Sequence, residues 1–336
     1  MTTLSKRPPW KVSLQDFPSA LPIQEQLEFL LQYAVLAPST KNTQPWRFSI
    51  GEDTIGVFAD LTRWQPVSDR GRRELYISLG CALENLLVAA EQFGLGYEVR
   101  YFPERGNEEL AATIALHPAA SPAVYRTGIS LDSITTRRTQ HGMYQDRSIL
   151  EDTRRRLLLS CDDLGLRVDL TDDPALRSRV VELNLHADEM EFADPEFRKE
   201  LGHWVGQGVF GTPRLLSRLG ELLLSRLNLG RAIGKRNAAV LSSAPLIGLI
   251  SARTDDRTSQ LKTGQALERI WLLATAMGLG LHPMSEALEI PSLRTALARV
   301  IPGEDWFPEQ VFRIGYPMRP EKRHTPRRPL DQVLLG

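Results

Sequence analysis

The sequence predicts an α+β protein built from two similar units. The first unit has the pattern of an amphipathic helix, a β-hairpin, a long helix and two further strands. Part of this pattern recurs later in the chain, at residues 264–280. With 336 residues, of which 42% are apolar and 24% charged, the chain is long enough for two domains of ordinary size.

The elements of the first unit follow from hydrophobic spacing and from turn signals. Apolar residues from Ile23 to Ala34 recur at intervals of three and four, which predicts a helix that Pro38 ends. Two short apolar runs on either side of residues 51–53 predict a β-hairpin. The other elements expected are a long helix at about 72–94 that ends at Gly94 and strands at 97–103 and 110–118.

An internal repeat is the most informative feature of the chain. Residues 80–96 and 264–280 share a glycine at the start, several helical positions and a Gly-Leu-Gly exit. Long helices share Ala and Leu by chance, but the shared glycines favour a genuine duplication. The repeat predicts a twofold unit, because a solenoid needs at least three repeats.

The second unit is longer than the first. Its opening helix is expected at 150–164, and much of the extra length lies in 211–236, a helical segment with Thr212 as N-cap and Pro213 at the first helical position. An addition of this size usually has a role. It could cover a site, form a dimerisation arm or add packing.

Composition narrows the classes of partner and compartment. Lys plus Arg equal Asp plus Glu at 41 each, so the whole-chain charge gives no case for nucleic acid or an anionic membrane. Cys81 and Cys161 lie far apart, which disfavours a disulfide framework or zinc site and favours the cytoplasm. No signal peptide is apparent at the start, and 238–252 is expected to be a buried strand with its lead-in rather than a membrane span.

Three motif-like segments have ordinary interpretations. Residues 206–211 match GxGxxG, but a helical segment precedes them and no acid follows at 225–235, so a glycine-rich turn is expected. His186 and Glu189 lie one helical turn apart without further ligands nearby, so a solvated helix face is expected and no metal site. No GxSxG motif supports a serine nucleophile.

Two arginine clusters suit a phosphate. Residues 135–142 and 324–332 each place an Arg-Arg pair near a Ser/Thr hydroxyl. A guanidinium can donate to two phosphate oxygens and a hydroxyl to a third. Each pair taken alone is better explained as a solubilising surface pair.

The segment Ala37–Phe48, "APSTKNTQPWRF", resembles the loop of the nitroreductase family of flavoproteins that lies against FMN. Residues 137–141 resemble the family's Arg-Arg-Ser-x-Arg phosphate motif, with Thr139 in place of Ser and His141 in place of the last Arg. Residues 278–289 resemble the loop that approaches the flavin ring, and the final strand and basic tail also match. The chain is most similar to the long, twin-type (Acg-like) branch of the family.

The resemblance implies a fold of two nitroreductase-like halves, each a mostly antiparallel sheet flanked by helices, fused as an internal dimer. The Pro-Ser loop occurs only in the first half and the Arg-Arg motif only in the second, which implies one FMN per chain. The expected divisions are an N-terminal extension at 1–22, a first half at 23–128, and a second half at 129–336 with a helical insertion at about 195–238 and a basic tail.

The resemblance also implies roles for individual residues. The FMN phosphate would be held by Arg137, Arg138 and Thr139, with Arg327 or Arg328, and the His141 substitution would alter that grip. The loop would contribute Pro38, Ser39, Thr40, Asn42 and Gln44 to the ribityl chain and ring edge, and Pro283, Met284 and Ser285 would lie beside the ring. The flavin would carry the chemistry, so no catalytic acid or base is expected.

The function implied is an FMN-dependent NAD(P)H oxidoreductase that reduces nitroaromatic or quinone acceptors by two-electron hydride transfer. The alternative is an FMN-sequestering or storage protein whose insertion covers the flavin. Expected partners are a small-molecule acceptor, with no nucleic acid and no membrane. The chain would act as a monomeric pseudo-dimer or as a homodimer of it.

Overall fold

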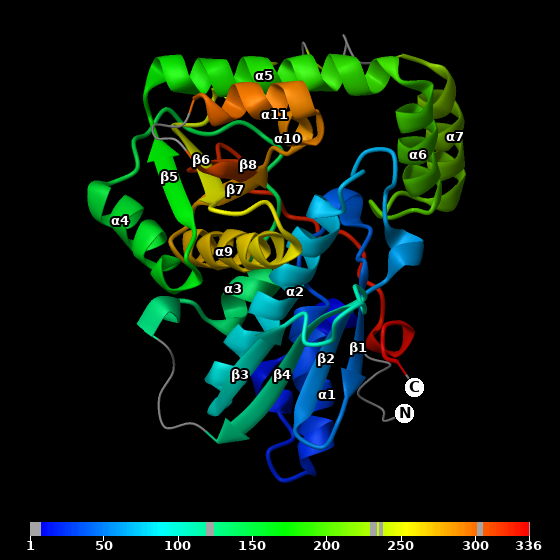
Figure 1. Cartoon of the computed structure of the whole chain (residues 1–336), viewed down its shortest axis with the longest axis vertical. Coiled ribbons are helices and arrows are strands. Elements are labelled where there is room, and N and C mark those ends of the chain that lie inside the picture. The colour runs from blue at the N-terminus through cyan, green and yellow to red at the C-terminus, as the bar shows by residue number, and fades with distance from the viewer. Residues whose placement is uncertain (1–7, 119–123, 229–233, 235–237, 301–304, 336) are drawn as a thin grey trace.

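A computed structural model of the chain describes residues 8–118, 124–228, 234, 238–300 and 305–335. It contains two four-stranded antiparallel sheets with the same strand order (Figure 1). In the first sheet the order is β1-β2-β4-β3, with bounds Trp46–Ile50, Thr54–Ala59, Leu110–Pro118 and Leu95–Tyr101. In the second it is β5-β6-β8-β7, with bounds Arg167–Thr171, Leu246–Ala252, Phe307–Gly315 and Gly280–Pro283. The expectation of an α+β fold with two similar halves is confirmed.

Helices flank both sheets and link equivalent strands. α2 joins β2 to β3 and α9 joins β6 to β7, so the repeat found in the sequence is one helix and strand connection used twice. The described α-helices include α1 (Ile23–Ala34), α2 (Arg73–Gln92), α3 (Leu131–Thr136), α4 (Glu151–Leu159), α5 (Pro174–Ala193), α6 (Pro195–Gly206), α7 (Arg214–Arg226), α9 (Arg257–Ala276), α10 (Glu286–Glu289) and α11 (Pro291–Ala298).

The two exits of the repeat have the same backbone conformation. Gly94, just after α2, has φ +75°, and Gly278, just after α9, has φ +74°. Side-chain-bearing residues rarely adopt this left-handed region, so glycine suits both positions. Each glycine ends its helix and turns the chain into β3 or β7.

A buried ion network joins α2 to α9. Glu84 has no exposed surface and accepts hydrogen bonds from Arg126 Nε at 2.7 Å and Arg269 Nε at 2.8 Å. Burial alone would raise the pKa of Glu84, but the two guanidinium groups lower it to about 2. Because an unpaired buried charge is costly, the network fixes how the two central helices meet.

The extra length of the second half lies between β5 and β6. In the described part of this connection lie helices α5, α6 and α7, whereas only three residues join β1 to β2 in the first sheet. The insertion expected at 195–238 contains the last two of them, and the boundaries of the halves stay a prediction. Thr212 is not the N-cap of α7: that position is Pro213, and the Thr212 hydroxyl lies 2.5 Å from the Ser217 hydroxyl. The helix therefore begins one residue later than expected.

The end of the chain returns to the first sheet. Phe48 N donates to Val333 O at 2.8 Å, and Leu335 N donates to Phe48 O at 2.7 Å, so the final residues pair with β1. This return carries Arg327 and Arg328 past the end of the Ser39–Gln44 loop. A tail belonging to the second half thereby becomes part of the first half's surface.

Three smaller segments singled out in the sequence can be located in the structure. Residues 207–210 form a turn between α6 and α7, as expected for the glycine-rich segment. His186 and Glu189 lie on the exposed face of α5, and no group of metal-ligating side chains occurs in the described residues. Among the helices that the structure describes, none is both long enough and apolar enough to span a bilayer.

Candidate functional site

The loop between α1 and β1 has an unusual backbone. Lys41, Asn42 and Gln44 have φ values of 49°, 56° and 53°, a region that residues with side chains seldom occupy. Each such residue costs on the order of 1–3 kcal/mol and persists only where its surroundings hold it. The Ser39 hydroxyl provides one restraint by accepting from Gln44 N at 2.9 Å. Concentrated strain of this kind favours a functional loop.

The C-terminal segment holds the loop from outside. Asn42 Oδ1 accepts from Arg327 Nη1 at 2.8 Å, and Asn42 Nδ2 donates to Pro326 O at 3.0 Å. Gln44 Oε1 accepts from Arg328 N at 2.7 Å. The two amide side chains assigned to the loop by sequence therefore meet both arginines of the tail.

Arg137 and Arg327 come together beneath this loop. Both guanidinium groups donate to the same oxygen, Leu36 O, at 2.9 Å and 3.2 Å. Arg137 also forms a buried ion pair, with 3.1 Å between its Nε and Glu268 Oε1, and its guanidinium lies over the Trp271 ring. The structure thus brings Arg137 of the second half's arginine motif next to Arg327 of the tail, and a shared phosphate-binding role for them stays a prediction.

Arg138 and His324 lie next to these two arginines. Arg138 Nη2 lies 2.6 Å from His324 Nε2, which must accept because a guanidinium has no acceptor. The His324 ring stacks on Trp10 at 3.8 Å. His324 begins the 324–332 cluster but was given no role from sequence, and Trp10 was missed because it lies far from both Arg-Arg pairs.

The electrostatics of the cluster Arg137, Arg138, His324 and Arg327 favour an anion. Burial, and then Arg137, lower the pKa of Arg327 and of Arg138. Burial and the three arginines lower the pKa of His324 to about 4. Arg137 thus disfavours the charged forms of Arg138 and Arg327, and Glu268 pairs with Arg137.

Arg328 differs from Arg327. Its Nη1 lies 3.1 Å from Asp60 Oδ2, and Arg47 Nη2 lies 3.1 Å from the other oxygen of the same carboxylate. The charge of Arg328 is therefore paired locally. Of the two tail arginines considered from sequence, Arg327 is the one that joins the cluster.

Thr139 and His141 lie beside β7. Thr139 pairs in parallel with Leu281, and Gln140 N donates to Leu281 O at 3.0 Å. The His141 ring packs edge-on against the His282 ring, with 4.8 Å between centroids. The histidine that replaces the motif's last arginine is therefore in contact with β7.

Pro283, Met284 and Ser285 continue from β7 towards α10. Met284 N donates to Val311 O at 2.8 Å, and its side chain is buried against α5 and α11. Ser285 Oγ accepts from Gln310 Nε2 at 2.9 Å. The backbone N–H of Met284 is thus used within the sheet, and a role of this segment beside a flavin ring stays a prediction.

A chain of buried charges connects the loop to α10. The Thr40 hydroxyl bonds to Glu74, Arg73 Nη2 lies 2.8 Å from Glu74 Oε1, and Arg73 also pairs with Glu289. Burial raises the pKa of Glu289 to about 7, in spite of Arg73. Sequence reasoning missed this connection, because Arg73, Glu74 and Glu289 lie in ordinary-looking helical segments.

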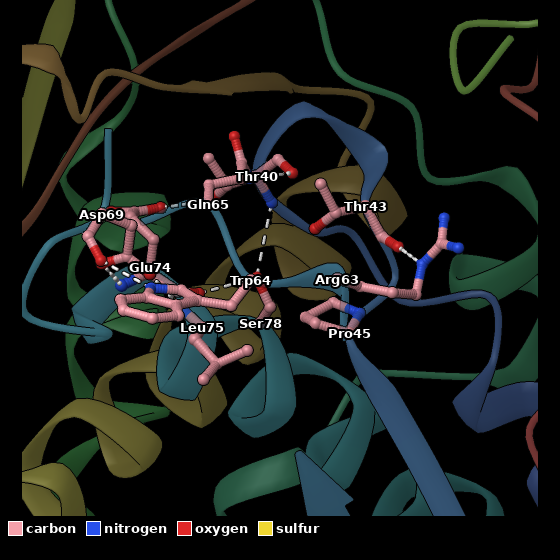
Figure 2. Close-up of a pocket in the computed structure, with 10 residues that line it drawn as sticks. All are labelled: Thr40, Thr43, Pro45, Arg63, Trp64, Gln65, Asp69, Glu74, Leu75 and Ser78. Atoms are coloured by element: carbon pink, nitrogen blue, oxygen red, sulfur yellow. Dashed lines mark hydrogen bonds between the residues drawn. The ribbon is translucent and has the colours of Figure 1, made fainter. Parts of the chain in front are cut away.

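Figure 2 shows the pocket under the loop. Thr40 N points to Ser78 Oγ at 3.4 Å, and Gln65 Nε2 donates to Thr40 O at 3.2 Å. Asp69 accepts from Leu75 N at 2.9 Å at the start of α2. The cavity volume of about 10 Å³ suits one water molecule. The residues that line this pocket therefore hold the loop in place, and the cavity is too small for a large ligand.

The α6–α7 hairpin, residues 195–226, lies over the loop. Asn42 Nδ2 donates to Val209 O at 2.5 Å in the turn between the two helices. Glu200 of α6 accepts from Val67 N and Ser68 N, both at 3.0 Å, and from Ser68 Oγ at 2.6 Å. The extra segment could cover a site, form a dimerisation arm or add packing, and these contacts favour a cover over the loop.

The chain is similar to known proteins over nearly its full length. Residues 170–316 match the model of the Nitroreductase family. A Mycobacterium tuberculosis protein with the provisional name NAD(P)H nitroreductase is 29% identical, over 93% of this chain and 92% of its own length. The protein acg of the same organism, provisionally named in the same way, is 25% identical over 94% of this chain and 97% of its own.

Solved structures provide more distant similarities. A nitroreductase with bound FMN from Bacteroides fragilis is 16% identical, with a TM-score of 0.38, over 58% of this chain and 92% of that one. One from Desulfitobacterium hafniense, also with bound FMN, is 14% identical, with a TM-score of 0.40, over 58% and 93%. These scores are too low to support a conclusion about this chain. The full-length relatives and the family match support the motif resemblance, and the chain is similar over nearly its whole length to long proteins of the nitroreductase type.

Proposed function

We propose that the protein is an FMN-dependent NAD(P)H oxidoreductase that reduces small nitroaromatic or quinone acceptors. The observation that carries the proposal is the meeting of Arg137 and Arg327 at Leu36 O, directly before the strained Ser39–Gln44 loop, together with the bond from Arg327 to Asn42 within that loop. The family match and the names of the full-length relatives support the reaction class.

The arginine cluster fits the phosphate of FMN. Arg137, Arg138 and Arg327 crowd together with Glu268 as the acid that offsets them, and a bound dianion would relieve their mutual repulsion. Arg138 and Arg327 would donate to phosphate oxygens. Arg137 would contribute charge from behind, because Leu36 O and Glu268 already orient its guanidinium.

The loop residues would hold the rest of the cofactor. Ser39, Thr40, Asn42 and Gln44 offer hydroxyl and amide groups on a backbone held by Pro38, Pro45 and the tail. A stiff loop loses little entropy when a ligand binds. When bound, FMN would accept two electrons from NAD(P)H and pass them to the acceptor, and the protein would bind and orient the reactants.

The α6–α7 hairpin bears on the alternative of flavin sequestration. Its contacts with Asn42 and Ser68 place it next to the proposed site, where it would limit access of nicotinamide. The relatives' names favour reduction rather than storage. Sequestration of FMN is therefore the alternative that the following experiment would reveal.

Anaerobic mixing of the FMN-loaded protein with NADPH, and separately with NADH, tests the function. Bleaching of the yellow flavin within seconds, followed by reoxidation on addition of a quinone, is expected. Persistent yellow colour with both donors would support sequestration and contradict the oxidoreductase. A protein that takes up no FMN would contradict both.

A further inference from the structure

Helix α7 has an exposed face of leucines. Leu215, Leu216, Leu219, Leu222 and Leu223 are between 45% and 84% exposed. Their spacing of three and four residues places them on one side of the helix. Scattered exposed leucines are normal, but five on one short helix form a continuous apolar surface.

The opposite side of α7 packs against α6 through small and polar residues. A β-carbon on Gly202 would lie 2.3 Å from Ser225 Oγ, and one on Gly206 would lie 2.2 Å from Glu221 Oε2. Ser217 is buried. Figure 1 shows α7 at the outer edge of the molecule, beyond α6. The helix therefore buries its polar side and exposes its leucines, the reverse of an ordinary surface helix.

Arginines border the leucine face. Arg218 precedes Leu219 and its side chain is 72% exposed, and Arg226 is exposed at the end of the helix. The segment 211–236 contains one acid, Glu221, and six basic residues, in a chain whose net charge is zero. The six are Arg214, Arg218, Arg226, Arg231, Lys235 and Arg236. Residues 211–236 are therefore strongly basic, although the whole chain carries no net charge.

We propose that α7 docks on the surface of an anionic lipid bilayer. The leucine face would lie in the boundary between head groups and acyl chains, and Arg218 and Arg226 would reach the lipid phosphates. Leucine on one face and arginine beside it is the combination that keeps a helix in the interface plane. Each basic residue near such a surface adds electrostatic attraction.

Charge complementarity favours the bilayer over a second copy of this chain. Two α7 helices packed face to face would bring the arginine-rich borders of both copies together, and like charges at an interface oppose association. An anionic surface would instead offer partners to Arg218 and Arg226, the two arginines of α7 whose side chains the structure describes as exposed. The proposal goes beyond the proposed reaction and does not depend on it.

Co-sedimentation of the full-length protein with vesicles tests the proposal. Vesicles of phosphatidylglycerol mixed with phosphatidylcholine should bind the protein, whereas vesicles of phosphatidylcholine alone should bind it at least about tenfold less. Raising the salt concentration to about 0.5 M should reduce binding, because charges are then screened within a few ångströms. Absence of binding, or equal binding to both vesicle types, would overturn the proposal.

Matched variants identify the surface. Leu219→Gln with Leu223→Gln should reduce binding by about tenfold or more. Leu150→Gln with Leu159→Gln, which changes two exposed leucines at α4, should leave it unchanged. Arg218→Gln with Arg226→Gln should remove the preference for phosphatidylglycerol. If light scattering instead shows a dimer that the Leu219 and Leu223 changes dissociate, the face binds a second copy and the proposal is wrong.

Discussion

The backbones of Gly80 and Gly264 touch where α2 crosses α9. A β-carbon on Gly80 would lie 1.9 Å from Leu261 O and 2.9 Å from Gly264 Cα. A β-carbon on Gly264 would lie 2.0 Å from Ile77 O and 2.8 Å from Gly80 Cα. Each glycine thus makes the same contact with the other half, as expected at the twofold axis of a symmetric pair.

Gly80→Ala should destabilise the protein strongly, because the new methyl group would meet backbone atoms that cannot move aside. A loss of at least ~2 kcal/mol is expected in the free energy of unfolding by urea. Gly71→Ala is the matched control, since a β-carbon there meets no atom within 4 Å. Equal stability of the two variants would contradict the close crossing.

The same two glycines show how much of the fold the sequence could predict. The repeat, the order of helices and strands, and the left-handed exits at Gly94 and Gly278 follow from local patterns. The direct contact of Gly80 with Gly264 does not, because it depends on how two distant helices cross. The sequence also gave no reason to expect that residues 333–335 would pair with β1, since strand pairing between distant segments leaves little local signal.

Arg138→Gln should weaken FMN binding about tenfold to a hundredfold, because a charge-assisted hydrogen bond contributes about 1.5–3 kcal/mol. Riboflavin, which has no phosphate, should bind the variant and the wild type equally. Arg323→Gln, an exposed change in the same tail, is the control. Both affinities can be measured by quenching of flavin fluorescence. Equal losses for FMN and riboflavin would show that Arg138 does not contact the phosphate.

Glu200→Gln should loosen the α6–α7 hairpin, because Glu200 accepts three hydrogen bonds from Val67 and Ser68. Faster hydrogen exchange in α6 and faster reduction of bound flavin by NADPH are expected. Glu196→Gln, which removes only an exposed pair with Lys199, should change neither rate. Faster exchange without faster reduction would mean that the hairpin does not limit access.

Glu268 should make stability depend on pH. Burial raises its pKa to about 7 in the folded protein, in spite of Arg137 and Arg327, from 4.5 when unfolded. Because the folded protein holds this proton more tightly than the unfolded chain, the full stabilising contribution is present below about pH 4.5. It is lost as the pH rises through about 7. Glu268→Gln removes this pH-dependent contribution. Between acid and neutral pH, the free energy of unfolding of the FMN-free variant should therefore rise relative to that of the FMN-free wild type by roughly 2–3 kcal/mol.

Urea unfolding at a series of pH values measures this difference. Glu98→Gln, an exposed carboxyl paired with Arg100, is the control and should show a difference that does not change with pH. Parallel pH profiles for the wild type and Glu268→Gln would mean that Glu268 keeps an ordinary pKa in the folded protein.

The candidate site could be predicted from sequence only where it carries motifs. The motifs pointed to the loop Ser39–Gln44 and to the Arg-Arg pairs; in the structure Arg327 and Arg328 contact the loop, and Arg137 contacts Leu36 just before it. Glu268 was detectable in principle, because the repeat matches it with Glu84 in otherwise apolar helices. His324, Glu200 and the Thr40–Glu74–Arg73–Glu289 connection depend on tertiary contacts, so local pattern could not reveal them.

The ratio of FMN to protein chain tests the central claim most directly, namely that the two halves share one site. Protein saturated with FMN, freed of excess and then denatured, should release one FMN per chain, because the loop with Ser39 and Asn42 and the motif with Arg137 and Arg138 each occur once. A ratio of two would mean that each half binds its own flavin. A ratio of zero would mean that the arginine cluster serves another anion.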